Sequence, residues 1–145
     1  MTVNIYHKEL LHLAAMARAH GRLNTPDASV TLDNPLCGDR VTIDVTVANG
    51  RVAEIAQDVR ACVLCQASVS ILGAHATGES SMAISEISNT VAAMLRGEAS
   101  APDGKWSEFS AFEPVRQYNS RHRCVMLPFE ALSKALAKAL ATAAD

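Results

Sequence analysis

The sequence predicts an α+β fold in which helices pack on one face of a small three-stranded antiparallel sheet. Apolar and polar side chains alternate over residues 41–47, and Asn49-Gly50 follows, a pattern typical of a strand that enters a tight hairpin. Apolar residues recur at helical spacing before residue 21 and again after residue 60. Because the strands are grouped, the pattern favours segregated helical and sheet layers. All 145 residues are expected to form one domain.

The first element is expected to be an amphipathic N-terminal helix over residues 5–20. Its apolar side chains recur on one face, and Gly21 follows as a stop signal. After Pro26 the apolar residues Val30 and Leu32 alternate with polar ones. This alternation predicts a short first strand.

The second and third strands are expected over residues 41–47 and 51–59. The Asn-Gly pair between them accepts the positive φ angles of a type I′ turn, so the two strands form an antiparallel hairpin. On the return strand Ala53, Ile55 and Val59 are expected to share the face that the helices cover. The opposite face is expected to be partly exposed to water.

Helices are expected to make up the rest of the chain. Ser80 or Ser81 is suited to cap the second of them, and Pro114 limits the extension of the third, which carries most of the aromatic residues. Pro128 fits the last helix if that helix begins within the preceding turn. The expected helices cover residues 62–76, 81–96 and 106–118, and a long C-terminal helix begins near Arg123 or Cys124.

Composition restricts the classes of partner. The chain has 13 Lys and Arg against 15 Asp and Glu, so no nucleic acid partner is expected. The N-terminus lacks the pattern of a signal peptide, and no run approaches the ~20 apolar residues of a membrane span. We therefore expect a cytoplasmic protein that does not bind membranes, in which the four cysteines are reduced.

One cysteine lies in the segment NPLCGD at residues 34–39. Pro35 and Gly38 flank the thiol of Cys37 and allow the backbone to turn sharply. Such a turn presents Cys37 and Asp39 toward one point, and Gly38 allows a ligand to approach the backbone closely.

Two further cysteines, Cys62 and Cys124, are expected at the starts of helices. The unpaired N–H groups and the dipole of a helix N-terminus favour a thiolate there, and Arg121 and Arg123 add positive charge beside Cys124. The spacing of the cysteines matches no short zinc-finger pattern. Taken by themselves, the residues leave open both a soft metal site and simple packing of small side chains.

Three segments together carry a family resemblance: NPLCGD at 34–39, Ala61-Cys62 with ASVS at 67–70, and Arg121 three residues before Cys124. This set resembles the U-type iron–sulfur cluster assembly proteins, which include IscU, the N-terminal domain of NifU, and SufU. The long interval between Cys62 and Cys124 is most similar to the SufU branch. IscU proteins have histidine at the position of Arg123 and a chaperone-docking motif before it, which this sequence does not reproduce.

The resemblance implies that Cys37, Asp39, Cys62 and Cys124 converge and hold Zn²⁺, iron or a transient [2Fe–2S] cluster. A cysteine desulfurase would supply persulfide sulfur to Cys37, with Arg121 beside the site as a supporting group or an exchange partner for the metal. The resemblance also implies that sulfur or a cluster passes on to downstream assembly proteins or apo-protein acceptors. Such a protein is a scaffold or carrier rather than a conventional enzyme, apart from a sulfurtransferase activity.

Three alternatives remain open on the sequence. The chain is also consistent with a zinc-dependent sulfurtransferase that builds no cluster, and with a structural module that zinc stabilises. A third alternative is a thiol oxidoreductase that uses Cys62 and Cys65, although the strand and helix order expected around such a motif is lacking. We expect Cys65 to pack in the core and His122 not to be a metal ligand.

Overall fold

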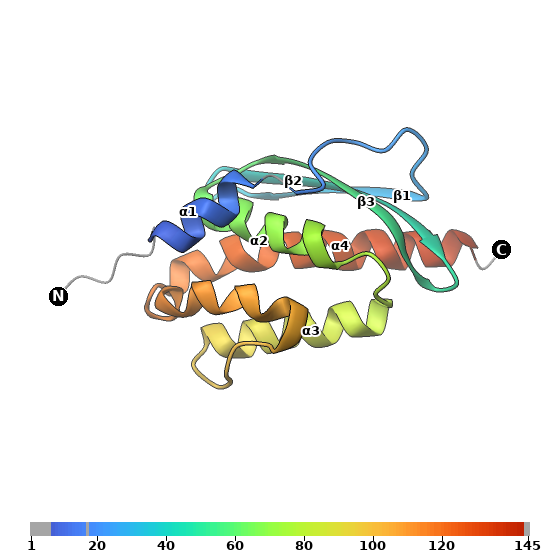
Figure 1. Cartoon of the computed structure of the whole chain (residues 1–145). Helices are drawn as coiled ribbons and strands as arrows, with labels where there is room; N and C mark the ends of the chain where they lie inside the picture. The colour runs from blue at the N-terminus through green and yellow to red at the C-terminus, as the bar shows by residue number, and fades with distance from the viewer. Residues whose placement is uncertain (1–6, 17, 144–145) are drawn as a thin grey trace.

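A computed structural model describes residues 7–16 and 18–143 and confirms the predicted fold class. Three strands form a sheet in the order β1-β2-β3, and both neighbouring pairs are antiparallel. Figure 1 shows the sheet as one layer with the helices gathered on one of its faces. The strands are β1 (Ala28–Asn34), β2 (Asp39–Ala48) and β3 (Arg51–Arg60).

The helices form two levels beneath the sheet (Figure 1). The long helix α4 (His122–Ala143) packs on β1 and β2, and α2 (Val63–His75) packs on β3 and α4. On the far side of α4 and α2 lie α3 (Ser81–Leu95) and the 3₁₀ segment η1 (Gly104–Gln117). No helix in the described ranges is long and apolar enough to cross a membrane. The remaining helical segments are α1 (Lys8–Ala15) and η2 (Asn119–Arg121).

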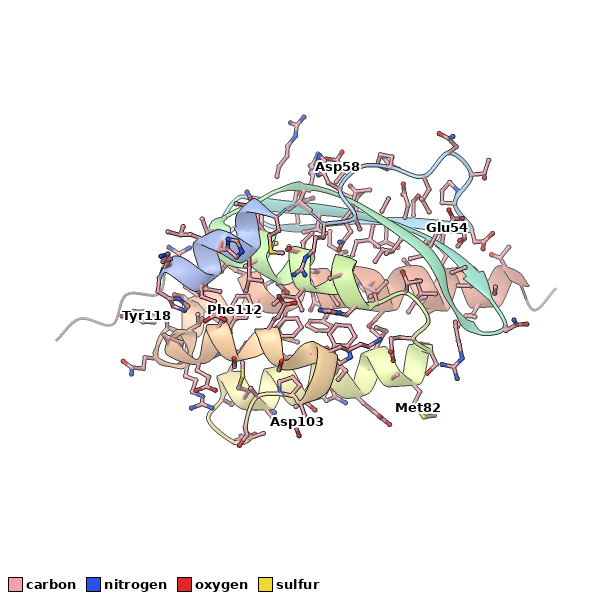
Figure 2. The ribbon with its side chains drawn as sticks, in the orientation of Figure 1. Glu54, Asp58, Met82, Asp103, Phe112 and Tyr118 are labelled. Atoms are coloured by element: carbon pink, nitrogen blue, oxygen red, sulfur yellow. The ribbon has the colours of Figure 1, made fainter. Side chains whose placement is uncertain are left out.

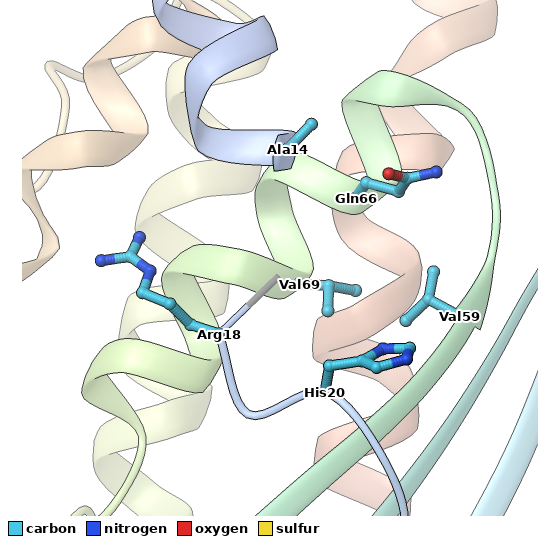
Figure 3. Close-up of a pocket in the computed structure, with 6 residues that line it drawn as sticks. All are labelled: Ala14, Arg18, His20, Val59, Gln66 and Val69. Carbon is cyan, nitrogen blue, oxygen red and sulfur yellow. The ribbon is translucent and has the colours of Figure 1, made fainter. Parts of the chain in front are cut away.

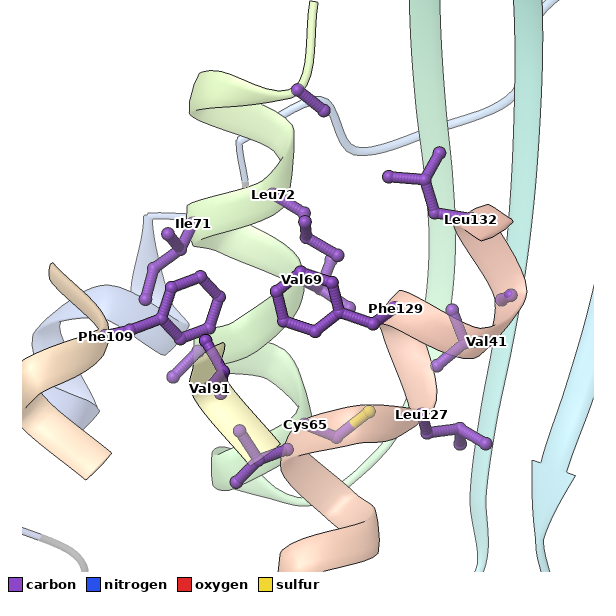
Figure 4. Packing of buried hydrophobic residues seen from close by; sticks show 14 of the residues in the cluster. Val41, Cys65, Val69, Ile71, Leu72, Val91, Phe109, Leu127, Phe129 and Leu132 are labelled. Carbon is purple, nitrogen blue, oxygen red and sulfur yellow. The ribbon is translucent and has the colours of Figure 1, made fainter. Parts of the chain in front are cut away.

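The core lies between the sheet and the helices. The rings of Phe109 and Phe129 pack with their centroids 5.3 Å apart, and side chains of α2, among them Ile71 and Leu72, lie beside them (Figure 4). On α4, Leu132 and Leu136 are buried while lysines occupy the opposite face, as the helical periodicity predicts. Burial of this apolar surface is the main force that holds the layers together.

The prediction of a first helix over residues 5–20 is wrong at its C-terminal end. Residues 5 and 6 lie outside the described ranges, and α1 ends at Ala15. Beyond it, Ala19 has a φ of +58°, and its carbonyl oxygen accepts a hydrogen bond of 2.8 Å from the Gln57 N–H. The Gly21 N–H in turn donates to the Gln57 carbonyl, also at 2.8 Å. The segment leaves the helix because it pairs briefly with β3, a long-range contact that periodicity does not reveal.

The predicted hairpin is confirmed, with one change in the face assignments. Asn49 and Gly50 have φ values of +55° and +74°, as a type I′ turn requires. A β-bulge between Thr46 and Val47 shifts the register, so that Val52 points into the core and Ala53 is exposed. The assignment of Ala53 to the covered face is therefore wrong. Ile55 and Val59 do pack against the core, while Glu54 and Asp58 are exposed on the outer face (Figure 2).

The later helices follow the predicted order with small differences. The Ser80 hydroxyl caps α3 by accepting the Ala83 N–H at 3.1 Å. The aromatic segment is a 3₁₀ helix, and Pro114 lies inside it rather than at its limit. This segment has the tighter winding of a 3₁₀ helix, and its Phe112 side chain is fully buried. The last helix begins at His122, slightly before the expected start.

Gly73 tests how closely α2 packs against residues 18 and 19, which follow α1. A Cβ atom at this position would lie 2.4 Å from the Arg18 carbonyl oxygen and 2.9 Å from the Ala19 Cβ. We expect Gly73→Ala to lower the free energy of unfolding by about 1–3 kcal/mol because backbone must move to admit the methyl group. Helix propensity alone would give the opposite sign, by about 1 kcal/mol. Chemical denaturation measures the difference.

The matched control for this prediction is Ala74→Ser, at the exposed neighbouring position of the same helix. This change should alter the free energy of unfolding by no more than about 0.5 kcal/mol. A Gly73→Ala variant as stable as the natural protein would contradict the close approach of residues 18 and 19 to α2.

Candidate metal centre

The candidate centre lies where the ends of β1 and β2 meet the starts of α2 and α4. On β2, the buried residues Val41, Ile43 and Val45 point toward the helices, and Asp39 continues this row at the end of the strand. Asp39 is only 1 % exposed. The alternation of the strand therefore directs a carboxylate into the helical layer at the edge of the core.

Cys37 lies at the tip of the loop that joins β1 to β2. Its backbone N–H donates to the carbonyl oxygen of Asn34 at 3.2 Å, and Gly38 has a φ of +70°. The thiol of Cys37 is half-buried, whereas the neighbouring Leu36 is 87 % exposed. The loop is thus a tight turn that leaves the thiol accessible, as the flanking proline and glycine predict.

Cys37, Asp39 and Cys124 form the compact part of the centre. The Cys124 thiol donates to the sulfur of Cys37 at 3.1 Å. One ligand atom from each of the three residues lies within 4.8 Å of the others, which is close enough for all three to hold one metal ion. Cys124 is fully buried in the first turn of α4, so the centre has a covered side and an accessible side.

Cys62 stands beside this group at the N-cap of α2. Its backbone N–H donates to Asp39 Oδ1 at 2.8 Å, and its sulfur lies 3.7 Å from Asp39 Oδ2. Cys62 is not within the compact group of three, but its backbone N–H and its sulfur both face Asp39, which belongs to that group. The structure therefore brings all four predicted ligands to one place, with Cys62 at its margin.

The two linked thiols Cys62 and Cys124 differ in their affinity for a proton. The hydrogen bond from Cys124 and the N–H groups of Leu64 and Cys65 lower the pKa of Cys62 to about 7, although burial and the Asp39 carboxylate oppose this shift. The hydrogen bond to Cys62, together with burial, raises the pKa of Cys124 far above its ordinary value. Of these two thiols, Cys62 is therefore the one that more readily becomes a thiolate.

Arg121 and Asn34 approach the sulfur atoms with N–H groups. Arg121 Nη1 lies 3.7 Å from the sulfur of Cys37. Asn34 Nδ2 lies 3.8 Å from the sulfur of Cys124. Asn34 was not among the predicted site residues, although it is the first residue of the NPLCGD segment.

Cys65 packs in the core, as predicted, and the ring of His122 is hydrogen-bonded to backbone. Cys65 is fully buried among apolar side chains of the core (Figure 4), and this burial raises the pKa of its thiol well above the ordinary value. His122 Nε2 is hydrogen-bonded to the carbonyl oxygens of Val115 and Arg116, at 3.0 and 3.2 Å. Neither residue belongs to the group of three that can hold a metal.

A separate cavity of about 150 Å³ lies between α2, β3 and the segment that follows α1 (Figure 3). Its lining includes Arg18, His20 and Gln66 but none of the cysteines. Arg18 is already engaged, since it donates to Ser70 Oγ at 3.0 Å and pairs with Glu108 at 3.2 Å. This cavity is therefore distinct from the candidate metal centre.

The donor set decides which metals fit this centre. Thiolate sulfur is the ligand that zinc and iron–sulfur clusters share, and a carboxylate oxygen is a harder and less strongly held fourth ligand. Calcium and magnesium prefer all-oxygen sites, so they do not match these residues. The chemistry of the donors therefore fits zinc or an iron–sulfur cluster.

The fold and the gathered thiols define the class of small U-type scaffold proteins for iron–sulfur cluster assembly. The family model described as NifU-like N terminal domain matches residues 5–138. The chain belongs to this family, as its three cysteine segments predict.

The similar curated proteins include members named IscU and SufU. The chain is 29 % identical over 136 residues to an iron–sulfur cluster assembly scaffold protein IscU of Thermotoga maritima, with 92 % of this chain and 94 % of the relative covered. It is 23 % identical over 134 residues to the zinc-dependent sulfurtransferase SufU of Bacillus subtilis, with 92 % and 90 % covered. Since both names occur, placement closest to the SufU branch stays a prediction.

Solved structures share the same fold. The crystal structure of a nitrogen-fixing NifU-like protein (N-terminal) from Brucella abortus has a TM-score of 0.89 and 32 % identity, and covers 94 % of this chain and 95 % of its own. A putative scaffold protein for the SUF system from Fervidobacterium islandicum has a TM-score of 0.83 at 21 % identity, with 91 % and 96 % covered. The second likeness supports the fold alone.

The proton distribution among the thiols leads to a test by alkylation. In the metal-free, reduced protein, iodoacetamide should modify Cys62 with a rate that rises with pH and reaches half its maximum near pH 7, because the thiolate is the reactive form. Cys65 should remain unmodified because it is fully buried and its pKa is raised. Mass spectrometry of peptides measures each cysteine separately. Half-maximal modification of Cys62 above pH 8.5, the region of an ordinary thiol, would contradict this distribution.

Proposed function

We propose that this chain accepts sulfur from a cysteine desulfurase and carries it, together with metal, at a centre formed by Cys37, Asp39, Cys62 and Cys124. In this role the whole chain acts as one scaffold domain for iron–sulfur cluster assembly in the cytoplasm. The observation that carries the proposal is the convergence of residues from distant segments: the sulfurs of Cys37 and Cys124 lie 3.1 Å apart beside Asp39, and the sulfur of Cys62 lies 3.7 Å from the same carboxylate.

Sulfur acceptance is assigned to Cys37 because its thiol is half-buried at the tip of a tight loop. The Cys37 thiolate attacks the outer sulfur of a persulfide on the desulfurase, and a new S–S bond forms as the old one breaks. The desulfurase cysteine leaves as a thiolate, so the step needs no outside oxidant or reductant. Arg121, 3.7 Å from the sulfur, attracts the negative charge that the thiolate carries.

The four ligands play different parts in holding the cargo. The buried Cys124 in α4 and Cys62 at the N-cap position of α2 provide the soft donors, whereas Asp39 provides the hard donor. Zinc or a [2Fe–2S] cluster, when bound, supplies a positive centre that keeps the thiols deprotonated. Because the carboxylate is the weakest ligand of the set, its release would open the centre for transfer to a downstream acceptor.

The second candidate is a zinc-dependent sulfurtransferase that builds no cluster. The approach of Arg121 to Cys37 favours it, since a guanidinium can stabilise the Cys37 thiolate when it leaves a metal. Anaerobic purification followed by addition of a desulfurase, cysteine and iron separates the two candidates. Zinc with persulfide and no visible cluster absorption would favour the sulfurtransferase, and a stable cluster band would favour the scaffold.

Replacement of Cys37 tests the sulfur acceptor. We expect Cys37→Ser to reduce persulfide formation on this chain by at least about tenfold when a desulfurase and cysteine are supplied, because a hydroxyl cannot accept sulfane sulfur. Mass spectrometry detects the added sulfur as a mass increase that a reductant removes. The matched control is Cys65→Ala, which removes a buried thiol and should leave persulfide formation intact. Undiminished persulfide in Cys37→Ser would transfer the acceptor role to another cysteine.

Replacement of Asp39 tests the hard ligand. We expect Asp39→Asn to weaken zinc binding by at least about tenfold, equivalent to about 1.4 kcal/mol, because a neutral amide replaces an anionic donor. The asparagine oxygen can still accept the Cys62 N–H, so the start of α2 should remain folded. Competition with a chelating dye measures zinc affinity, and circular dichroism checks the fold.

Asp39→Ala removes both functions of the carboxylate and completes this comparison. Zinc affinity equal to that of the natural protein in Asp39→Asn and Asp39→Ala would exclude Asp39 as a ligand. If zinc removal alone unfolded the natural protein and a desulfurase had no effect on it, the structural zinc module would be the better description.

A further inference from the structure

Asn34 is connected to several parts of the candidate metal centre although it is not among the predicted ligands. It ends β1, is 1 % exposed and pairs with Asp39 across the β1–β2 ladder. Its carbonyl oxygen accepts the Cys37 N–H at 3.2 Å, and its side-chain Nδ2 points to the sulfur of Cys124 at 3.8 Å. A single buried residue thus contacts the segment of one thiol and the sulfur of another.

The three sulfur atoms differ in the polar groups that face them. Arg121 Nη1 lies 3.7 Å from the sulfur of Cys37, and the Asp39 carboxylate lies 3.7 Å from the sulfur of Cys62. Cys124 is fully buried, where a thiolate has no access to water and depends on donors from the protein. The side-chain amide of Asn34 is the donor that faces it.

The side-chain oxygen of the Asn34 amide is unfavourable for the stability of the fold. Its Oδ1 is buried without a hydrogen-bond partner, a situation that is uncommon in folded proteins. A leucine has nearly the same shape and would leave no such atom behind. The sequence keeps an amide at a position where an apolar residue would be the more stable choice, which is typical of functional sites.

We propose that Asn34 is a positioning residue of the metal centre, whose side-chain N–H donates to the Cys124 thiolate when metal is bound. The hydrogen bond orients this buried ligand and withdraws electron density from its sulfur. This inference rests on the proposed function, because it requires that Cys124 bind metal.

The test uses Co²⁺ as a probe, since it accepts tetrahedral thiolate sites and its sulfur-to-metal absorption reports on the sulfur atoms. In Asn34→Leu we expect Co²⁺ affinity to fall by about 10–100-fold, the usual effect of losing a partner of a metal ligand. The sulfur-to-cobalt band should move to lower energy because the sulfur lone pair loses its hydrogen bond. The metal-free variant should unfold at the same temperature as the natural protein or above it.

Gln57 offers a matched control. It is also a fully buried amide whose Oε1 lacks a partner, but its Nε2 donates to the Val69 carbonyl oxygen at 2.9 Å, among apolar residues of the core. Gln57→Met should leave both Co²⁺ affinity and the absorption band unchanged. Changes in Asn34→Leu that Gln57→Met reproduces would attribute them to general packing and overturn the proposal.

A second measurement uses the unaltered protein and does not depend on the folding of a variant. With ¹¹³Cd bound, nuclear magnetic resonance should detect a coupling between the metal and a side-chain amide proton of Asn34, transmitted through the hydrogen bond and the sulfur. Absence of this coupling, or an unchanged cobalt spectrum and affinity in Asn34→Leu, would overturn the role of Asn34. Failure of the unaltered protein to bind Co²⁺ through thiolates would instead overturn the proposed centre itself.

Discussion

The register of the β1–β2 hairpin is the constraint on which the candidate metal centre depends. The ladder pairs Asn34 with Asp39, and the inward alternation that buries Val41 and Ile43 also turns Asp39 toward the helices. Because side chains alternate between the two faces of a sheet, a slip of one residue would direct this carboxylate outward. Burial of the apolar row against α4 fixes the register, so the hydrophobic core also positions a ligand of the centre.

The carboxylate of Asp39 combines a structural contact with a chemical one. Oδ1 accepts the Cys62 N–H at 2.8 Å and so ties the start of β2 to the start of α2, whereas Oδ2 faces the sulfur of Cys62 at 3.7 Å. A ligand held in this way can leave a metal without leaving its place in the fold. Because the two oxygens make separate contacts, Asp39 can serve as the one weakly held ligand of a site whose other donors are thiolates.

Two of the thiols lie at helix N-termini. Cys62 occupies the N-cap position of α2 and Cys124 lies in the first turn of α4, so both sulfurs lie near the positive ends of helix dipoles. The same kind of position does not activate Cys65, which lies one turn further along α2 and is fully buried. Exposure and donor contacts thus separate a reactive cysteine from a packed one within a single helix.

The sequence by itself determined the fold class, the hairpin turn at Asn49-Gly50 and the segments that carry Cys37, Cys62 and Cys124. These features depend on local φ preferences and on short-period alternation, which a sequence displays directly. The family followed from the same three segments, and the match of residues 5–138 to the NifU-like model agrees with it.

Only the tertiary structure decided the features that depend on contacts distant in sequence. The first helix ends at Ala15 because residues 19–21 pair with β3, and a bulge in the hairpin moves Ala53 to the exposed face. Likewise, the contact between Asn34 and the sulfur of Cys124 joins residues 90 positions apart. Such contacts form when the layers pack together, and the periodicity of one segment does not indicate which distant residues it will contact.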